Sequence, residues 1–465
     1  MARIFRHYVP ISLIAVAAIE ALILIVSVYL GVHFGVSGPN PTENLLVGPL
    51  WSKALFYTGV MILFLATMGL YARGLRENIQ GVLFRIGLAL FSGLVVMLTV
   101  VLVVPALTIG KSALMLSFFN SAVAIVVFRC LLHKFARRSL FRRRVMVLGT
   151  GKLAAQVQRL RRKVDQRDMC LVGYVYVPGE ECVVDPEKVL KIKTSVSALA
   201  LQHKVEEIVI AFDERRHHYP VMDVLECKMS GIKVMELMTF FEQQTGRIPL
   251  DGLTPSSLIF ADGFVQAIVK TYVRRTFDVI VSAMMLVMTS PLMAAVAIVI
   301  YLESGGRDPI LYRQRRVGRN GGCFQILKFR SMRIDSETKQ SPRWAAQSDD
   351  RVTRVGALIR KFRLDELPQI VNVLKGEMSF VGPRPERPEF VELLKSEIPF
   401  YDLRHCVNPG ITGWAQIGYP YGASVRDAKE KLEFDLYYIK NYSLFLDVMI
   451  LIHTAQIVLW GRGAR

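Results

Sequence analysis

Four long apolar runs open the sequence and constrain its fold more than any other feature. They cover roughly residues 10–34, 53–72, 85–108 and 114–133. Each run approaches or exceeds the ~20 residues that a helix needs to cross the hydrocarbon core of a bilayer. A cleaved signal peptide is the alternative for the first run, because Arg3 and Arg6 precede it, but this run is long for such a segment and three comparable runs follow. We therefore predict a four-helix transmembrane bundle over residues 1–140.

Basic residues set the expected orientation of this bundle. They cluster before the first run, between the second and third runs, and after the fourth, whereas the opposite loops hold only Lys53 and Lys111 near their edges. Because Lys and Arg favour cytoplasmic loops, both ends of the bundle are expected on the cytoplasmic side.

Composition narrows the classes of partner. The 465 residues carry 58 Lys+Arg against 39 Asp+Glu, a net charge of +19, and 52% are hydrophobic. The basic residues lie beside apolar segments rather than in a solvated tail, which favours a lipid bilayer and phosphorylated substrates and disfavours nucleic acid. The six cysteines form no C-x-x-C pair, which argues against a disulfide framework or a zinc site.

Residues 141–260 change to short apolar strands that alternate with helical patterns. Strands are expected at 145–148, 171–177 and 207–211, and the letters GTGKLA at 149–154 form a glycine turn that enters a helix. This βαβ pattern predicts a cytoplasmic Rossmann-like α/β domain. A dinucleotide site is one interpretation of the turn. Glu180 and Glu181 come late for a ribose-binding acid, so a scaffold without a cofactor is the favoured interpretation, and nucleotide binding stays open.

A fifth apolar run differs from the first four and predicts a helix at 275–303. Arg274 and Arg275 lie at its start and five arginines from 307 to 319 follow it, so a full crossing would place one basic flank outside. Ser290 and Pro291 lie near its middle, where proline kinks a helix. A re-entrant helix that breaks at Ser290 and Pro291 and returns to the cytoplasmic side satisfies both observations. The alternative is a kinked full span followed by an external C-terminal domain.

Two adjacent carboxylates, Asp365 and Glu366, lie in a strongly basic stretch, RKFRLDELPQ at 360–369. Pro368 suits the first turn of a helix that runs from 369 to 375 and ends at Gly376, so the pair is expected at a helix N-terminus, a favourable place for phosphate. The plain alternative is two acids that stabilise a helix start by capping and through the helix dipole. Further motifs surround the pair: QRRVGR at 314–319, FQILKFRSM at 324–332, DDRVTRVG at 349–356, GEMSFVGPRP at 376–385 and NPGITGWAQ at 408–416.

In this order and at these spacings, the motifs resemble the bacterial sugar transferase family. These are the large monotopic polyprenyl-phosphate phosphoglycosyl transferases, which include the undecaprenyl-phosphate glucose and galactose phosphotransferases of exopolysaccharide biosynthesis. The motifs cover the chain from about residue 273 to its end, whereas the N-terminal half matches only in layout. The resemblance implies a catalytic domain at 270–465, seated on the re-entrant helix and facing the cytoplasm at the bacterial inner membrane.

The resemblance also implies the reaction and two residue roles. A sugar-1-phosphate, from a UDP-sugar with a hexose and glucose as the first expectation, passes to undecaprenyl phosphate with release of UMP, as the first membrane step of polysaccharide assembly. By the resemblance Asp365 is the nucleophile that forms a covalent phosphosugar intermediate, and Glu366 is a ligand of Mg²⁺. The break at Ser290 and Pro291 belongs to the same family pattern.

Attack of a carboxylate on a diphosphate needs charge neutralisation. A guanidinium group binds phosphate oxygens in a bidentate way, so arginines are the expected partners of Mg²⁺ in this task. The first candidates for phosphate binding are Arg360 and Arg384, followed by Lys328, Arg330 and Arg354. The prolines at 383 and 385 would stiffen the backbone of Arg384.

Two other functions stand as alternatives. A membrane-tethered nucleotide-sugar oxidoreductase or dehydratase would use the glycine turn at Gly149, and a non-catalytic scaffold of polysaccharide export would not need an intact Asp–Glu pair. No residue distinguishes one hexose from another, and a homodimer is left open.

Overall fold

The computed structural model describes residues 2–4, 7–9, 11–35, 49–71, 79–136, 143–158, 160, 169–192, 195–213, 220–261, 263–264, 268–333, 352–419, 422 and 424–460. The arginines at 72–78 and 137–142, in loops that are expected on the cytoplasmic side, lie outside these residues, as does the start of the DDRVTRVG motif. The chain divides into two compact units. Unit 1 comprises Met1–Ala2 and Tyr8–Thr245, and unit 2 comprises Arg3–His7 and Gly246–Arg465. The division into three domains stays a prediction.

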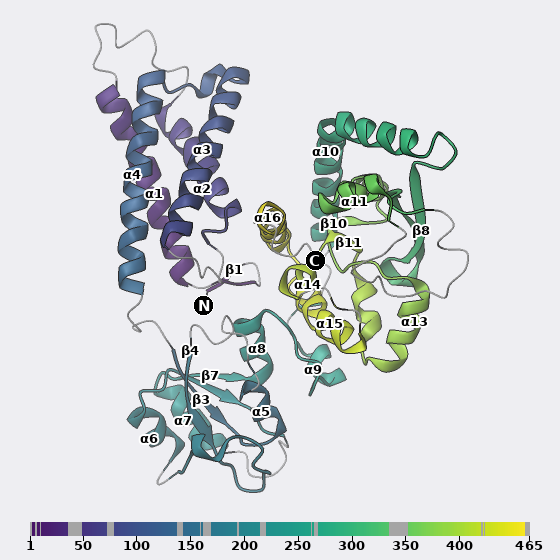
Figure 1. Ribbon diagram of the computed structural model, residues 1–465. Coiled ribbons are helices and arrows are strands. Elements are labelled where there is room, and N and C mark those ends of the chain that lie inside the picture. Colours follow the sequence, from purple (N-terminus) through teal and green to yellow (C-terminus); the bar gives the residue numbers. More distant parts are fainter. Residues whose placement is uncertain are drawn as a thin grey trace. The chain divides into compact units, whose positions relative to one another are not determined.

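Unit 1 opens with four long helices, which Figure 1 shows in purple and blue. Their bounds are α1 Ile11–Gly35, α2 Leu50–Thr67, α3 Ile79–Val103 and α4 Lys111–Ala136. Gly31 allows α1 to approach α4 closely, since a Cβ at that position would lie 2.0 Å from Ser117 Oγ. Glu20 of α1 is fully buried and its Oε1 lies 2.5 Å from Nε of Arg129 in α4. The buried carboxylate of Glu20 in α1 is therefore paired with an arginine of α4.

The second part of unit 1 is a five-stranded parallel sheet in the order β5-β4-β3-β6-β7. The strands are β3 Arg143–Leu148, β4 Met169–Val175, β5 Val189–Leu190, β6 Glu207–Ile210 and β7 Lys233–Glu236. Helices α5 Lys152–Gln158 and α8 Leu237–Thr245 cover one face, and α6 Val196–Gln202 and α7 Val221–Met229 cover the other. The predicted α/β region is confirmed, and its strand order, 3-2-1-4-5 counted along the chain, is that of a doubly wound sheet.

Unit 2 contains one very long helix, α10 Ile268–Glu303, which has Pro291 in its interior. Figure 1 shows that α10 bends sharply part-way along. The part before the bend, which begins at Ile268, is the first arm, and the part after it, which ends at Glu303, is the second arm. A proline removes a backbone donor and is a frequent cause of such a kink. Thirty-six residues in a straight helix would span ~54 Å, well beyond the ~30 Å hydrocarbon core. The helix is bent but continuous through Ser290 and Pro291, so a break at these residues and re-entry into the membrane stay proposals.

The first arm of α10 is attached to the rest of unit 2 by polar groups. Arg274 is buried, with its Nε 2.9 Å from Asp447 Oδ2, and it donates a hydrogen bond of 2.7 Å to Tyr438 Oη. Arg275 donates to the carbonyls of Val373 and Leu374, at 2.6 Å each. From the sequence, the two arginines are predicted to be a basic flank of a membrane segment. The structure shows that both also hold α10 on the globular domain.

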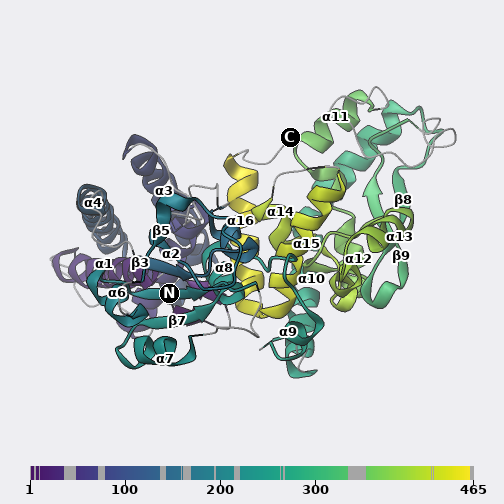
Figure 2. The same ribbon diagram turned by 90° about the horizontal axis from the view of Figure 1, so that it is seen from below.

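The other elements of unit 2 are short. They are α9 Pro255–Ile259, β8 Leu311–Val317, β9 Cys323–Phe329, α11 Arg354–Lys361, η5 Leu364–Glu366, α12 Gln369–Lys375, β10 Ser379–Val381, α13 Pro388–Glu397, η6 Tyr401–Cys406, β11 Gly410–Thr412, α14 Trp414–Gly418, α15 Val425–Lys440 and α16 Leu444–Trp460. β8 pairs with β9 in an antiparallel hairpin, and β10 pairs with β11 in parallel. Figure 2 shows α15 and α16 from below, beside α14.

Within the described residues, five helices are long and apolar enough to cross a membrane, namely α1 to α4 and α10. The apolar runs predicted from the sequence are therefore helices, and a membrane protein is supported. α16 is apolar but shorter, and its buried Leu446 and Ile450 belong to a core that also contains Tyr438 of α15.

Candidate active site

Asp365 and Glu366 lie where the chain reverses between two helices. Arg363 adopts the left-handed region at φ 54°, and the 3₁₀ turn η5 then carries both carboxylates. Pro368 precedes α12, which ends before Gly376 at φ 89°. The predicted helix start after this proline and its end at the glycine are confirmed.

Apolar neighbours fix the position of this turn. Leu364 and Leu367, on either side of the carboxylates, pack against a cluster that contains Ile359 of α11 and both Val296 and Ile300 of α10. The second arm of α10 therefore supports the turn directly. The two carboxylates of the turn are therefore held on a largely buried apolar cluster, which limits how far they can move.

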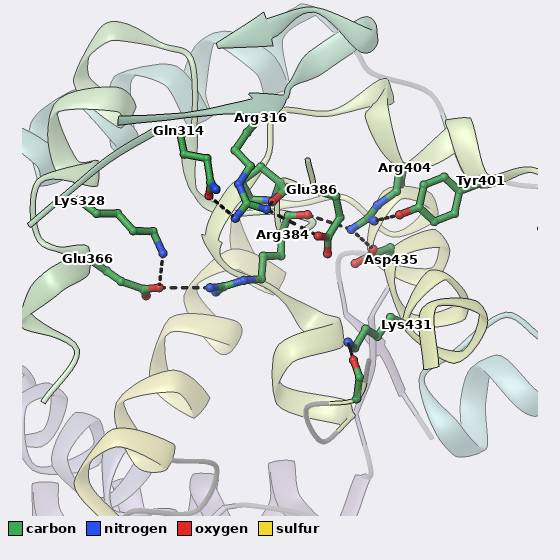
Figure 3. Close-up of polar contacts among 12 residues, drawn as sticks. Gln314, Arg316, Lys328, Glu366, Arg384, Glu386, Tyr401, Arg404, Lys431 and Asp435 are labelled. Carbon is green, nitrogen blue, oxygen red and sulfur yellow. Dashed lines mark hydrogen bonds and ion pairs between the residues drawn. The ribbon is translucent and has the colours of Figure 1, made fainter. Parts of the chain in front are cut away.

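Glu366 is the anionic member of an ion-pair cluster, shown in Figure 3. Its Oε1 lies 3.2 Å from Lys328 Nζ, which comes from β9, and 3.2 Å from Arg384 Nη2, which follows β10. Arg363 Nη1 lies 4.0 Å from Oε2 of the same carboxylate. Three cations from three segments thus converge on one carboxylate.

The two adjacent carboxyl groups have opposite pKa shifts. Burial raises the pKa of Glu366, but the charges of Arg384 and Lys328 outweigh burial and bring this pKa to about 2. Burial also raises the pKa of Asp365, the negative charge of Glu366 raises it further, and Lys328 and Arg360 offset only part of the increase. In the part of the chain that the structure describes, Asp365 forms no ion pair. Asp365 is thus the more basic carboxylate and the less engaged one, which suits a nucleophile.

Of the predicted phosphate-binding residues, some lie near the carboxylate pair and others do not. Arg360 lies in the last turn of α11 and acts electrostatically on Asp365, so it lies near the pair, as do Lys328 and Arg384. Arg330 instead pairs with Asp308, at 2.7 Å between Nη1 and Oδ2. Arg354 begins α11, ~9 Å along the helix axis from Arg360. The phosphate-binding roles of Arg330 and Arg354 stay predictions, without support from their positions.

Comparison with known proteins bears on this site. The model of a family described as bacterial sugar transferase matches residues 269–461. The UDP-glucose:undecaprenyl-phosphate glucose-1-phosphate transferase of Xanthomonas campestris pv. campestris is 31% identical over 371 residues, which are 75% of this chain and 74% of the relative. The chain belongs to the bacterial sugar transferase family.

Other bacterial sugar transferases match over a smaller share of their length. The UDP-N-acetylgalactosamine-undecaprenyl-phosphate N-acetylgalactosaminephosphotransferase of Aeromonas hydrophila is 44% identical over 239 residues, 51% of this chain and 55% of the relative. The undecaprenyl-phosphate glucose phosphotransferase of Komagataeibacter xylinus is 34% identical over 330 residues, 69% of this chain and 60% of the relative. This chain spans less than two thirds of the length of these two relatives.

A divalent cation in this bacterial sugar transferase would need oxygen ligands. Among the described residues, no three His, Cys, Asp or Glu side chains gather as a ready ligand set. Mg²⁺ is usually held by one or two carboxylates together with substrate phosphates and water, so Glu366 and Asp365 fit the donor set it prefers. Oε1 of Glu366 already faces Lys328 and Arg384, so Oε2 is the freer oxygen for a metal.

The glycine turn of the α/β region carries its own anions. Glu180 accepts hydrogen bonds from the amides of Thr150, at 2.8 Å, and Asp213, at 2.9 Å. Asp213 in turn accepts from the amides of Lys152, at 2.7 Å, and Leu153, at 2.8 Å. These amides are the donors that would bind a pyrophosphate in a dinucleotide site. Glu180, which comes late for a ribose, instead occupies the turn itself.

Sequence reasoning missed three charged residues near Arg384, namely Arg316, Arg404 and Asp435. Arg316 carried a usable signal, because side chains alternate along a strand and it points to the opposite face from Arg315 in β8. Arg404 and Asp435 come from η6 and α15, and no local pattern in the sequence links them.

Proposed function

We propose that this protein transfers a sugar-1-phosphate from a UDP-sugar to undecaprenyl phosphate and releases UMP. The observation that carries the proposal is the Asp365–Glu366 pair, in which one carboxylate is fixed by Lys328 and Arg384 and the other is not. The relatives, which are glucose and N-acetylgalactosamine phosphotransferases that use undecaprenyl phosphate, support the same reaction.

The reaction proceeds in two displacements at one phosphorus atom. An oxygen of Asp365 attacks the phosphorus that carries the sugar, the bond from this phosphorus to the bridging oxygen breaks, and UMP leaves with that electron pair. The product is an acyl phosphate on Asp365 that retains the sugar. A phosphate oxygen of undecaprenyl phosphate then attacks the same phosphorus and releases the Asp365 carboxylate. Two substrates of very different polarity therefore never need to react with each other directly.

Charge neutralisation comes from the cations around the pair. Arg384 and Lys328 lie within reach of the diphosphate that Asp365 attacks, since both contact the adjacent Glu366. Arg360 adds a third positive charge near Asp365. Mg²⁺, held by Glu366 and Asp365, would supply further neutralisation of the diphosphate when bound.

The membrane arrangement is part of the proposal. The apolar helices α1 to α4 form a transmembrane bundle, and α10 enters the cytoplasmic leaflet and returns through its bend. The catalytic domain then faces the cytoplasm of the bacterial cell at the inner membrane, where UDP-sugars are made and undecaprenyl phosphate is embedded. Support comes from the distribution of basic residues. Because the second arm of α10 packs under the turn that carries Asp365, the site would lie close to the lipid surface.

One assay tests the reaction and its nucleophile. Full-length protein in membranes is incubated with undecaprenyl phosphate and, in turn, UDP-glucose, UDP-galactose and UDP-N-acetylgalactosamine, and UMP is measured. Release of UMP is expected with at least one donor, and with UDP-glucose first among them. Asp365→Asn should reduce release to background and form no phosphosugar adduct, because the amide is not a nucleophile.

The matched control is Asp402→Asn, the same chemical change at an exposed aspartate whose described ion pairs are with Lys395 and His405 and not with any residue of the proposed site. This variant should retain wild-type UMP release. Full activity of Asp365→Asn would contradict the covalent mechanism, and absence of UMP with every donor would contradict the reaction.

A further inference from the structure

The segment that carries Arg384 is held in an unusual way. Pro383 and Pro385 have no backbone N–H, so this stretch has few donors with which to attach itself to its surroundings. Its carbonyl oxygens are the remaining backbone groups that can anchor it. Each of four successive carbonyls, from residue 383 to residue 386, accepts a hydrogen bond from another part of the chain.

Two of these bonds come from backbone amides. Gly410 N donates to the Pro383 carbonyl at 3.0 Å, and Val317 N donates to the Glu386 carbonyl at 2.9 Å. They fix the two ends of the segment, one on β11 and the other on β8.

The two central bonds come from arginine side chains, as Figure 3 shows. Arg404 Nη2 donates to the carbonyl of Arg384 at 3.0 Å, and Arg316 Nη1 donates to the carbonyl of Pro385 at 3.1 Å. The guanidinium of Arg404 thus holds the backbone of Arg384, while the guanidinium of Arg384 itself contacts Glu366.

The side chain of Arg404 is itself held by two other residues, Asp435 and Tyr401. It is buried, its Nη2 lies 3.1 Å from Asp435 Oδ2, and its Nη1 donates to Tyr401 Oη at 2.5 Å. Asp435 is also buried and neutralises the guanidinium charge. A buried ion pair of this kind adds little net stability compared with well-packed apolar residues. An apolar pair could not bridge a carbonyl and a carboxylate. Here Nη2 contacts both groups, and the second nitrogen of the planar guanidinium fork, Nη1, is held by Tyr401.

We infer that Arg404 is a positioning residue, which sets the Arg384 guanidinium against Glu366 and the donor diphosphate and is itself held in place by Asp435. This inference rests on the proposed sugar-phosphate transfer. It assigns no contact between Arg404 and the substrate. Its effect passes through the backbone of Arg384, whose half-exposed side chain would otherwise sample many conformations.

A double-mutant cycle tests the inference with full-length protein. Arg404→Lys keeps the charge and removes the fork, and it should lower kcat/KM for the UDP-sugar by about tenfold or more, since a displaced catalytic group lowers the rate strongly. Arg384→Ala removes the side chain that is positioned. In the Arg384→Ala background, Arg404→Lys should therefore cause little further loss. Equal losses in the two backgrounds would overturn the inference, because a purely structural role does not depend on the Arg384 side chain.

Arg247→Lys is the matched control for this cycle. Arg247 also pairs with carboxylates of α15, at 2.7 Å to Glu430 and 3.3 Å to Glu433, but none of its described contacts involves the segment at 383–386. Its effect should be the same in both Arg384 backgrounds.

A second readout does not depend on turnover. The affinity for UDP, measured by calorimetry on the same four proteins, should show the same coupling between Arg404 and Arg384. A wild type that releases no UMP from any UDP-sugar would contradict the proposed reaction, and the UDP-binding cycle would still decide the role of Arg404.

Discussion

The adjacent carboxylates Asp365 and Glu366 have different properties because different side chains surround them. Glu366 has Lys328 and Arg384 at 3.2 Å, whereas Asp365, one position earlier, forms no ion pair within the described ranges. The pKa of Glu366 is about 2 and that of Asp365 is raised. As the pH falls, Asp365 therefore takes up a proton before Glu366 does.

The acid limb of the pH–rate profile should report Asp365. Activity is expected to rise with pH as this carboxyl group loses its proton, and Glu366, ionised down to about pH 2, should not contribute. Lys328 lowers the pKa of Asp365, so Lys328→Met should move the acid limb to higher pH, besides lowering kcat by about 100-fold. UMP release between pH 4 and pH 9 would measure both effects. Asp402→Asn is the control and should leave the acid limb unchanged. An acid limb that is also unchanged in Lys328→Met would contradict this assignment.

At the scale of elements, the two arms of α10 contact different parts of unit 2. The first arm is bound through Arg274 and Arg275 to the domain that contains α12 and α16. The second arm packs beneath the turn that carries the carboxylate pair, with Val296 and Ile300 in the same cluster as Leu364 and Leu367. A change inside this helix should therefore affect both stability and catalysis.

Two isoleucines of α10 separate these effects. Ile300 is 1% exposed, so Ile300→Ala should lower the free energy of unfolding by about 2–5 kcal/mol through the cavity it leaves, and it should also lower kcat. Ile298 is 58% exposed in the protein, so Ile298→Ala should change neither by much. Chemical denaturation in detergent and UMP release would measure the two quantities. Equal behaviour of the two variants would show that the second arm does not support the turn.

At the scale of the whole molecule, topology connects the units to the membrane. Both ends of the bundle are predicted to be cytoplasmic, and a re-entrant α10 would keep unit 2 on that side. A full crossing by α10 would place the carboxylate pair outside, away from UDP-sugars.

Cysteine labelling distinguishes these topologies. In a background without the six native cysteines, Ser304→Cys, just after α10, should react with a membrane-impermeant reagent only from the cytoplasmic side. Asn44→Cys, between the first two apolar runs, should react only from the opposite side and serves as the control. Labelling of Ser304→Cys from the periplasm would rule out re-entry.

Local rules predicted the parts of this protein whose causes are local. Proline at a helix start and glycine at its end were enough to place α12, and strand patterns with a glycine turn were enough for the parallel sheet. The surroundings of Arg384 depend instead on η6, α15 and β8, which meet only in the folded domain. The stiffness expected from its two prolines was therefore only part of the reason that this residue is held.

The carboxylates that fill the glycine turn of the α/β region have a practical consequence. An immobilised nucleotide retains a protein through any surface that accepts its phosphates, and in unit 1 the amides at Thr150, Lys152 and Leu153 are already bonded to Glu180 and Asp213. A UDP-bearing resin should therefore retain this protein through its catalytic domain, and free UDP, rather than NAD, should elute it.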